Sequence, residues 1–524
     1  MLERALSLLL RKRVRRRRAG IDASGRDPAA AQARVLRALL ARAARTEWGR
    51  RYGYDSIRNY DDFRRRVPLG DYALQSPVWH RAFAGERDLA WPGHVRYFAM
   101  SSGTTAGNKY LPVSRDTIQS NRRGALAIAA AYGDLTGDRE LARGRFFYLG
   151  GSARLRPKGA CLEGDASGIM LRETPRAALR FRLPEPEVAA VESWSERLEA
   201  IVERCTCDDY RRVKLLSGCP VWIAALFRRL LAASGAACMA ELWPGLRAIV
   251  TYGMDPAPYR ASLEALVGAA AGAPAAGRPP AFIDTYSSSE GGMSAIQWAD
   301  SGGAMRLLVD GGAFYEFIPM EEADAPEPRR LSIGEVEPGC VYELALSTDA
   351  GIWAYRVGDL VRVENVSPPL IRFAGRTKLT LSVSGEHVIE EELIRAAAAG
   401  AEASGARIEE FTVAPVGPDE TGGVPRHDWL VEFSQPPGDA DAFLRAADDA
   451  LAAGNSDYAD HRRGDAALGA PRLVPLAPGT FGAWLARAGR LGGQFKVPRV
   501  PPSREVARAI LAVSDDLAAK ERGA

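Results

Sequence analysis

The pattern of apolar positions changes along the chain. Between residues 27 and 45 they recur at the spacing of a helix that packs one face against a core: Val35, Leu36, Leu39, Leu40 and Ala43. Beyond residue 90, short apolar runs alternate with helical stretches, which is typical of an α/β core. We expect a helix through residues 125–132, capped by Ser114, and strands at residues 95–100, 110–113, 246–252, 282–286, 314–319 and 341–347.

The last 150 residues follow a different order. A helix is predicted near residues 388–399, and an αββαβ order is completed by strands 408–416 and 429–434, helix 439–453 and strand 472–475. We therefore expect an α/β protein with a large N-terminal domain (residues 1–375), its β-sheets flanked by helices, and a smaller α+β C-terminal domain (residues 376–524). We expect the boundary between the two domains near residues 375–378.

Composition adds few constraints. A chain of 524 residues with 47% hydrophobic and 26% charged residues is long enough for two or three globular domains. A net charge of +4 is too small to indicate a nucleic-acid-binding protein. Six cysteines without CxxC spacing favour neither a disulfide framework nor zinc. No apolar run approaches the roughly 18 residues of a membrane helix, so we expect a cytoplasmic protein without a transmembrane segment.

The N-terminus is the most basic part of the chain. Residues 1–18 combine four leucines with the basic run of residues 11–18, a pattern compatible with weak contact to an anionic membrane surface. A solvated helix end is the alternative, and it is the interpretation that we favour.

Three polar motifs each follow or adjoin a predicted strand. The first, SSGTTAGNK (residues 101–109), has glycines and hydroxyls suited to wrapping main-chain N–H groups around phosphates. It is not the GxxxxGK[ST] loop of P-loop nucleotidases, because Lys109 follows Asn108 and the next element is predicted to be a strand. Taken alone, the motif is better interpreted as a flexible Ser/Gly turn.

The second motif, YSSSEGG (residues 286–292), lies at the end of a buried strand, where open α/β sheets place their ligand crevice. Its Glu290 is suited to hold Mg²⁺ beside phosphates. The third, YRVGD (residues 355–359), follows a hairpin-like turn, and Asp359, at a strand boundary, could accept hydrogen bonds from ribose hydroxyls. Each has a plain turn as its alternative; the order of all three favours a nucleotide site.

With these motifs the chain resembles the Gretchen Hagen acyl-acid amido synthetases, part of the superfamily of adenylate-forming enzymes. The resemblance spans nearly the whole length. It rests also on six further segments: FRRRVPLGDYA (63–73), TYGMD (251–255), FYEFIP (314–319), GRTK (375–378), GTFGAW (479–484) and GQFKVPR (493–499).

The resemblance implies a set of ATP-binding residues. The phosphates would lie against Ser101, Ser102, Gly103, Thr104, Thr105 and Gly107, with Ser102 and Thr105 as catalytic hydroxyls. The adenine would be bordered by Gly253, Met254 and Tyr286, with Glu290 on Mg²⁺ and Asp359 on the ribose. Further nucleotide contacts would come from Ser287, Ser288, Tyr355 and Arg376. Lys496, one of only seven lysines, would be the mobile catalytic lysine that reaches the α-phosphate.

The implied reaction is ATP-dependent ligation of a carboxylic acid to an amino acid or another amine through an acyl-adenylate. The small domain would be mobile, with a hinge in residues 375–387. An acyl-CoA ligase is the nearest alternative, and a membrane-surface interaction protein is an alternative of another class. Candidate acyl-pocket residues are Tyr148, Pro220, Trp222 and Phe227, although residues 218–227 are better interpreted as helix core.

Overall fold

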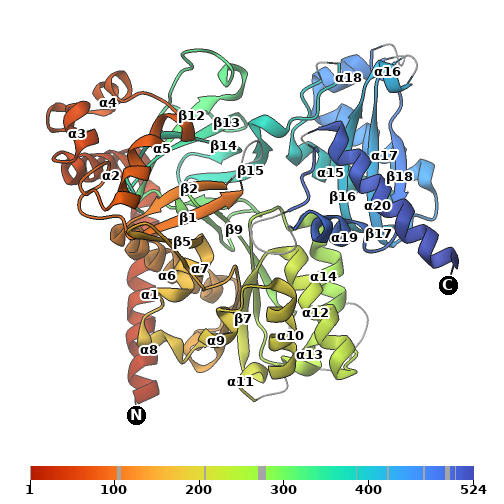
Figure 1. Cartoon of the computed structure of the whole chain (residues 1–524), viewed down its shortest axis with the longest axis horizontal. Coiled ribbons are helices and arrows are strands. Elements are labelled where there is room, and N and C mark those ends of the chain that lie inside the picture. The colour runs from red at the N-terminus through yellow and green to blue at the C-terminus, as the bar shows by residue number, and fades with distance from the viewer. Residues whose placement is uncertain are drawn as a thin grey trace. The chain divides into compact units, whose positions relative to one another are not determined.

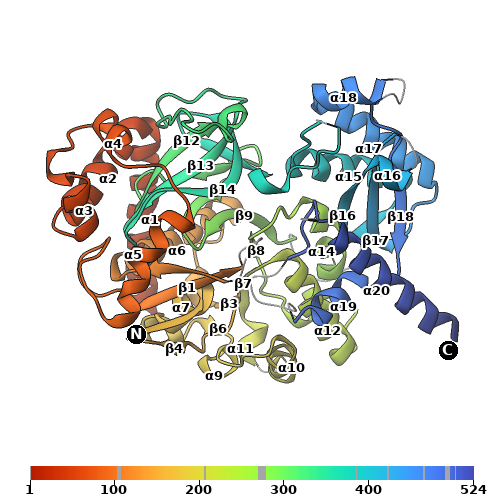
Figure 2. The same cartoon turned by 45° about the horizontal axis from the view of Figure 1, so that its top comes forward.

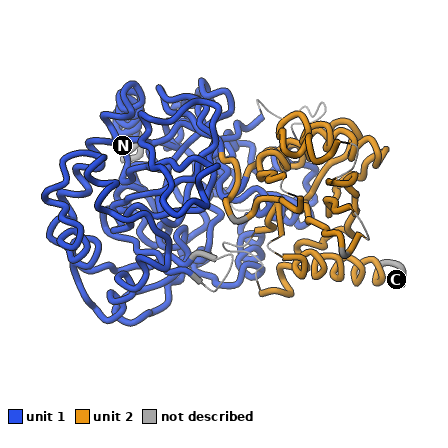
Figure 3. Tube along the Cα trace, turned by 90° about the horizontal axis from the view of Figure 1, so that it is seen from above, with its two compact units in different colours: residues 1–254, 264–372 blue, residues 255–263, 373–524 orange. Residues whose placement is uncertain are grey.

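The structure is a computed structural model, and it describes residues 2–102, 108–205, 208–268, 279–384, 386–421, 424–463, 467–489, 496–501 and 503–523. The chain divides into two compact units (Figure 3). Unit 1 comprises residues 1–254 and 264–372, and unit 2 comprises residues 255–263 and 373–524. A short segment between two parts of unit 1 thus belongs to unit 2.

The main sheet of unit 1 has eleven strands. Its order is β12 (Ala313–Pro319), β13 (Val341–Thr348), β14 (Ile352–Asn365), β15 (Leu370–Arg376), β11 (Met305–Leu307), β10 (Gly292–Gln297), β9 (Ala281–Ser288), β8 (Ala248–Tyr252), β7 (Val213–Gly218), β3 (Arg145–Leu149) and β6 (Arg182–Leu183). The strands from β9 to β6 pair in parallel, whereas β10 pairs antiparallel with β9 and β11. The carboxyl ends of β8 and β9 therefore lie at the same edge.

Helices cover both faces of the parallel strands (Figures 1 and 2). α6 (Arg115–Thr136) buries Ala127, Ala131 and Tyr132 in a cluster with apolar residues of β7 to β10. On the opposite face, Phe147 of β3 contacts Trp243, which in turn contacts Phe227 of α12 (Pro220–Ser234). Alternate residues of a strand point to opposite faces, so β3 serves both layers.

A smaller sheet carries the first motif. Its order is β2 (Asn108–Val113), β1 (Tyr97–Ser102), β5 (Cys161–Asp165) and β4 (Arg156–Lys158). The other helices of unit 1 are α1 (Leu2–Arg26), α2 (Pro28–Ala43), α3 (Glu47–Arg51), α4 (Tyr60–Arg66), α5 (Tyr72–His80), α7 (Ala166–Arg172), α8 (Arg176–Leu179), α9 (Pro186–Ala189), α10 (Trp194–Arg204), α11 (Asp208–Arg211) and α13 (Met239–Leu242). α14 (Arg260–Val267) begins in unit 2 and ends in unit 1.

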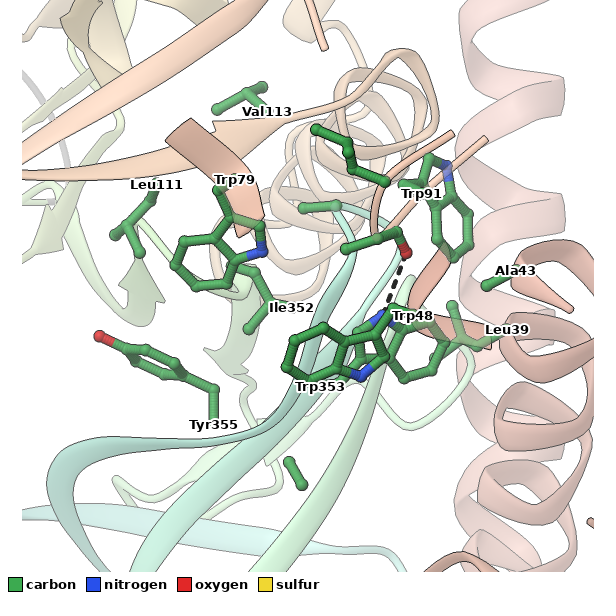
Figure 4. Packing of buried hydrophobic residues seen from close by; sticks show 14 of the residues in the cluster. Leu39, Ala43, Trp48, Trp79, Trp91, Leu111, Val113, Ile352, Trp353 and Tyr355 are labelled. Atoms are coloured by element: carbon green, nitrogen blue, oxygen red, sulfur yellow. Dashed lines mark hydrogen bonds between the residues drawn. The ribbon is translucent and has the colours of Figure 1, made fainter. Parts of the chain in front are cut away.

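The core beside the smaller sheet is rich in aromatic residues. Figure 4 shows Trp79, Trp91 and Trp353 packed around the start of β14, where Trp353 Nε1 donates a hydrogen bond of 3.1 Å to the carbonyl of Ala90. Large aromatic side chains contribute much of the energy of a core, provided that their polar atoms are paired. This cluster holds β14, the strand that carries the third motif.

Unit 2 is built on a three-stranded sheet, with β17 (Arg426–Gln435) between β16 (Arg407–Val416) and β18 (Arg472–Leu476). One face packs against α15 (Glu390–Ser404) and α17 (Ala440–Gly454), and the other against α19 (Thr480–Arg487) and α20 (Arg504–Gly523). Figures 1 and 2 show this arrangement. The remaining elements of unit 2 are η4 (Ala257–Tyr259), η6 (Thr377–Leu379), α16 (Pro418–Thr421) and α18 (Ser456–Arg462).

Most predicted elements are confirmed with shifted ends. Ser114 accepts a hydrogen bond from the N–H of Thr117 at the start of α6, as expected of a cap, and the αββαβ order of the C-terminal part is present. The prediction that Asp359 lies at a strand boundary is wrong, because β14 continues to Asn365. Gly358, with a φ of +81°, bends β14 beside a register shift and allows the strand to continue. No helix within the described ranges has both the length and the apolar character needed to cross a bilayer.

Candidate active site

The carboxyl ends of β8 and β9 bring the TYGMD and YSSSEGG motifs together. Tyr252 pairs with Thr285 in the parallel register, so Gly253 and Met254 follow β8 beside Tyr286 of β9. Gly253 has a φ of +89°, a conformation that a residue with a Cβ rarely adopts. The chain therefore turns sharply at the sheet edge, where the family resemblance places the adenine.

The turn from β9 to β10 holds Glu290. The N–H of Gly291 donates a hydrogen bond of 3.0 Å to the hydroxyl of Ser288, and the N–H of Met293 donates one of 3.2 Å to Asn121 of α6. A Cβ at Gly292 would lie 2.7 Å from that Asn121 oxygen, so a side chain here would clash. These contacts fix the turn, and only 8% of Glu290 is exposed.

The start of β14 is held by a distant segment. Gly70, within the FRRRVPLGDYA motif, donates to the carbonyl of Ala354 over 3.1 Å and accepts from the N–H of Arg356 over 2.7 Å. Ala354 itself has a φ of +42°, an unfavourable conformation for alanine. Backbone strain of this kind persists only where surrounding contacts determine the conformation. The hydrogen bonds of Gly70 with Ala354 and Arg356 are such contacts, and they hold the main chain on both sides of Tyr355.

Tyr286 and Asp359 connect the second and third motifs. The phenol of Tyr286 donates a hydrogen bond of 2.8 Å to a carboxylate oxygen of Asp359. Each residue is only 6% exposed. An ionised carboxylate is an acceptor with two oxygens, which is the type of group that binds vicinal hydroxyls.

Tyr355 lies near Glu290. Its ring is fully buried, and its hydroxyl has no hydrogen-bond partner among the described residues. In Figure 4 this hydroxyl points away from the tryptophan cluster. Burial raises the pKa of Tyr355 well above its ordinary value, and the charge of Glu290 raises it further. An unpaired buried donor near the charge of Glu290 fits a polar ligand in unit 1.

The first motif is described only at its ends. β1 and β2 pair antiparallel, with Ser102 opposite Asn108. The predicted strand after the motif is thus confirmed, and the exclusion of a P-loop holds because no helix follows. Gly103, Thr104, Thr105 and Gly107 lie outside the described residues, and only the main chain of Ser101 and Ser102 is described. Residues 267–280 are almost entirely Ala, Gly and Pro, which predicts a surface excursion; this stretch also falls largely outside the described residues.

A small cavity of about 20 Å³ adjoins Glu290 and Gly291. Asp349, in the β13–β14 turn, lines it and accepts a short hydrogen bond from the hydroxyl of Ser120. Burial is the main reason that the pKa of Asp349 is raised to about 6. This volume suits about one water molecule rather than a substrate. Asp349 lies in a turn next to Ser347 and Thr348, and no local sequence signal distinguishes it from an exposed turn carboxylate.

Lys496 lies in unit 2 near a carboxylate that sequence reasoning missed. Burial raises the pKa of Glu390, while the charges of Arg499, Arg376 and Lys496 lower it. Glu390 also lies close to the main chain at Gly375, where an added Cβ would be 3.0 Å from it. The basic residues that the resemblance places at the nucleotide, Arg376 and Lys496, therefore share one acidic neighbour within unit 2.

The candidate acyl-pocket residues are mostly core. Phe227 is fully buried in α12, and Trp222 contacts Trp194 with ring centroids 5.1 Å apart. Pro220 is buried at the start of the same helix. Tyr148 stacks on Tyr252 at 5.9 Å. This packing favours the interpretation of residues 218–227 as helix core.

Metal ligands are sparse in the described part of the chain. No group of three or more His, Cys, Asp or Glu side chains there is arranged to hold a metal ion. A cation at Glu290 would therefore have fewer than three His, Cys, Asp or Glu ligands among the described residues. That fits Mg²⁺, which usually keeps several waters and binds through one or two carboxylates together with substrate phosphates.

Part of the basic N-terminal run is paired within unit 1. Arg17 forms an ion pair with Asp310, and Arg18 forms one with Asp134. Leu8 and Leu9, by contrast, are 65% and 58% exposed. The helix is thus anchored by its second half.

The chain matches known proteins along most of its length. Models of the GH3 family match in three places: the N-terminal domain at residues 17–158, the central domain at residues 306–376 and the C-terminal domain at residues 391–505. The indole-3-acetic acid-amido synthetase GH3.8 of Oryza sativa subsp. indica is 25% identical over 91% of this chain and 89% of its own length. The probable indole-3-acetic acid-amido synthetase GH3.12 of Oryza sativa subsp. japonica is 26% identical over 96% of each.

Solved structures agree in fold. The AtGH3.15 acyl acid amido synthetase in complex with 2,4-DB has a TM-score of 0.75 at 18% identity, covering 95% of this chain and 96% of that one. A 2-hydroxyisobutyryl-CoA ligase in complex with 2-HIB-AMP has a TM-score of 0.55 at 15% identity, covering 97% and 91%. The expected α/β fold of an adenylate-forming enzyme is thereby confirmed. From residue 17 to residue 505, the three family models follow one another in order along a chain with this fold, and the chain belongs to the GH3 family.

Proposed function

We propose that this protein is an ATP-dependent acyl-acid amido synthetase. It activates a carboxylic acid as an acyl-adenylate with release of pyrophosphate, and it transfers the acyl group to an amino acid or another amine with release of AMP. Family membership supports the reaction class. The observation that carries the proposal is the hydrogen bond from Tyr286 to Asp359, which joins the second motif to the third in unit 1.

Activation is needed because a carboxylate is a poor acyl electrophile. Its charge is delocalised, and its oxygen is a poor leaving group. When a carboxylate oxygen attacks the α-phosphorus of ATP, the bond to pyrophosphate breaks and the acid becomes a mixed anhydride with AMP. An amine then attacks the carbonyl carbon and AMP departs. The protein positions the reactants and stabilises charge that accumulates on the phosphorus oxygens.

The nucleotide would be bound mainly by unit 1. We assign the ribose hydroxyls to Asp359, whose orientation is fixed by Tyr286. We assign the adenine to the edge formed by Gly253, Met254 and Tyr286, with Ser287, Ser288 and Tyr355 completing the site. The phosphates are assigned to Ser101–Gly107, with Ser102 and Thr105 contributing hydroxyls.

Glu290 is proposed to hold Mg²⁺. The ion, when bound, would neutralise charge on the triphosphate oxygens. Glu290 contributes a nearly buried carboxylate held on a turn that Ser288 and Asn121 fix from both sides. A carboxylate restrained in this way costs little further ordering when it binds a cation.

Unit 2 would supply the cationic groups. Lys496 is proposed to contact the α-phosphate and the acyl oxygen, and Arg376 to contact the nucleotide. We also propose a large domain (residues 1–375) and a small mobile domain (residues 376–524), with residues 375–387 as the hinge. Rotation of the small domain would then separate the adenylation step from the transfer step.

An acyl-CoA ligase is the competing function, because it shares the first step. The test is a competition reaction: purified protein, ATP, Mg²⁺ and a panel of carboxylic acids, with an amino acid pool and coenzyme A offered together. Mass spectrometry should detect amides and AMP. A thioester without an amide would contradict the proposal, and AMP formation with neither product would indicate a different acceptor.

We also propose a cellular location for the protein and a surface that its N-terminal helix contacts. A cytoplasmic location fits an enzyme that consumes ATP. Weak contact of residues 1–18 with an anionic membrane would rely on Leu8 and Leu9 together with the neighbouring basic residues. Sedimentation with vesicles of phosphatidylglycerol, compared with vesicles of phosphatidylcholine, tests this contact: equal sedimentation with both, or with neither, argues against it.

A further inference from the structure

Residues 497–500, which follow Lys496, are fixed to the sheet of unit 2. The N–H of Val413 in β16 donates a hydrogen bond of 2.8 Å to the carbonyl of Arg499, and the hydroxyl of Thr412 donates one of 2.7 Å to the carbonyl of Pro498. Val497 and Val500 are buried in the apolar clusters on the two faces of this sheet. The main chain directly after Lys496 is therefore held over four consecutive residues.

The side chain of Arg499 adds a second, directional attachment. Its guanidinium donates a hydrogen bond of 2.5 Å to Glu410 and another to the main-chain carbonyl of Phe411. It also donates one of 2.5 Å to the hydroxyl of Tyr259, which in turn donates to Glu410 at 2.8 Å. Three elements thus meet in one network: η4, β16 and the segment that carries Lys496.

This network is buried. Arg499 and Tyr259 are each 3% exposed and Glu410 is 5% exposed. The guanidinium also lies over the ring of Phe411, at 4.3 Å from its centroid. A buried ion pair is weak evidence for stability, because apolar residues of similar size often serve as well. Arginine differs from them in the fixed direction of its hydrogen bonds, so the network is suited to orientation.

The guanidinium of Arg499 and the ammonium group of Lys496 both act on the same carboxylate, that of Glu390. Glu390 interacts electrostatically with Arg499, Arg376 and Lys496. Displacement of Arg499 would therefore alter both the main chain next to Lys496 and the balance of charge around Glu390. Both effects would change the position of the Lys496 ammonium group.

We propose that Arg499 is a positioning residue for the catalytic lysine: held by Glu410 and Tyr259, it fixes the place from which Lys496 reaches the reacting phosphate. This inference rests on the proposed function, in which Lys496 contacts the α-phosphate during adenylation. All three residues of the network belong to unit 2, so the arrangement belongs to the same compact unit as the lysine.

Two substitutions test the network at different strengths. Tyr259→Phe removes one hydroxyl and keeps the ring and both charges, and Arg499→Met removes the guanidinium. Arg487→Met is the matched control, because Arg487 forms an exposed ion pair with Asp516 in the same unit. We expect kcat for pyrophosphate release to fall about 3- to 10-fold in Tyr259→Phe and about 30- to 100-fold in Arg499→Met, with KM for ATP changed less than about twofold. The control should match the unmodified protein.

A double-mutant cycle separates positioning from general damage. In a Lys496→Ala background, Tyr259→Phe should cause no further loss of kcat, because the group that it positions is gone. Equal losses with and without Lys496, or an unchanged kcat in Tyr259→Phe, would overturn the inference. Should Arg499→Met not fold, the Tyr259→Phe cycle decides alone. If Lys496→Ala itself keeps full activity, the proposed role of the lysine fails, and this inference fails with it.

Discussion

Tyr286 donates a hydrogen bond of 2.8 Å to Asp359, which joins the end of β9 to the middle of β14. The two residues are 73 positions apart, and their strands are not neighbours in the sheet order. Three strands, β15, β11 and β10, lie between β14 and β9 in that order. The pair is the structural centre of the proposed nucleotide site.

Asp359→Ala should weaken ATP binding by about 1–3 kcal/mol, because ribose hydroxyls would lose a charged acceptor. Tyr286→Phe should have a smaller effect of about 0.5–1.5 kcal/mol, since the carboxylate stays but loses its orienting donor. Isothermal titration with ATP and Mg²⁺ measures both. Equal affinities in all three proteins would show that this pair does not contact the nucleotide.

Lys496→Ala should slow adenylation by about 10²- to 10³-fold with little change in KM for ATP, as expected of a contact made mainly in the transition state. Lys520→Ala is the control, because Lys520 is an exposed lysine of α20. Steady-state pyrophosphate release measures both parameters. A raised KM with unchanged kcat would assign Lys496 to ground-state binding instead.

Glu290→Gln keeps the size of the side chain and removes its charge. We expect the Mg²⁺ concentration for half-maximal pyrophosphate release to rise at least about tenfold, because a neutral amide is a weaker ligand for a hard cation. The measurement is a Mg²⁺ titration at saturating ATP. An unchanged midpoint would remove Glu290 from the metal site.

Asp349 predicts a dependence of stability on pH. Its pKa is raised from 3.8 to about 6, chiefly by burial, with the charge of Asp116 adding to the shift and the charge of Arg123 opposing it. Between pH 4 and 6 the folded protein retains a proton that the unfolded chain releases, so the free energy of unfolding should fall as the pH rises. The loss amounts to up to about 3 kcal/mol. Urea unfolding of Asp349→Asn should lack this component; an identical profile in both proteins would refute the assignment.

The lowered pKa of Glu386, in unit 2, predicts that the free energy of unfolding rises with pH, which is opposite to the effect of Asp349. Burial alone would raise its pKa, but hydrogen bonds and the charge of His427, together with the N–H of Ser384, lower it to about 2. Its stabilisation is complete above about pH 4.5 and is lost as the pH falls towards 2. Glu386→Gln should lower the free energy of unfolding by about 1–3 kcal/mol at neutral pH and flatten this acid limb. Equal acid limbs would contradict that prediction.

Local features of the fold could be predicted from the sequence. Ser114 has the side chain of a helix cap, and residues 110–113 read as a strand after SSGTTAGNK; both features are present. These properties depend on neighbours within a few residues. The prediction that YSSSEGG lies at the end of a buried strand is also confirmed, because β9 ends at Ser288.

Long-range contacts could not be predicted in this way. Gly70 pairs with Ala354 and Arg356 across more than half the chain, and Arg499 reaches Tyr259 across 240 positions. Such pairs leave no periodic signal, since each partner sits in an ordinary local pattern. The extension of β14 beyond Asp359 was missed because Gly-Asp is more often a turn than part of a strand.

The central claim is that the acid becomes an acyl-adenylate, and isotope transfer tests it most directly. A carboxylic acid accepted in the panel would be labelled with ¹⁸O in both carboxylate oxygens and incubated with the protein, ATP, Mg²⁺ and the accepted amine. Mass spectrometry should find one ¹⁸O in AMP, one in the amide and none in pyrophosphate. Labelled inorganic phosphate with ADP, or an amide formed with unlabelled AMP, would contradict the account.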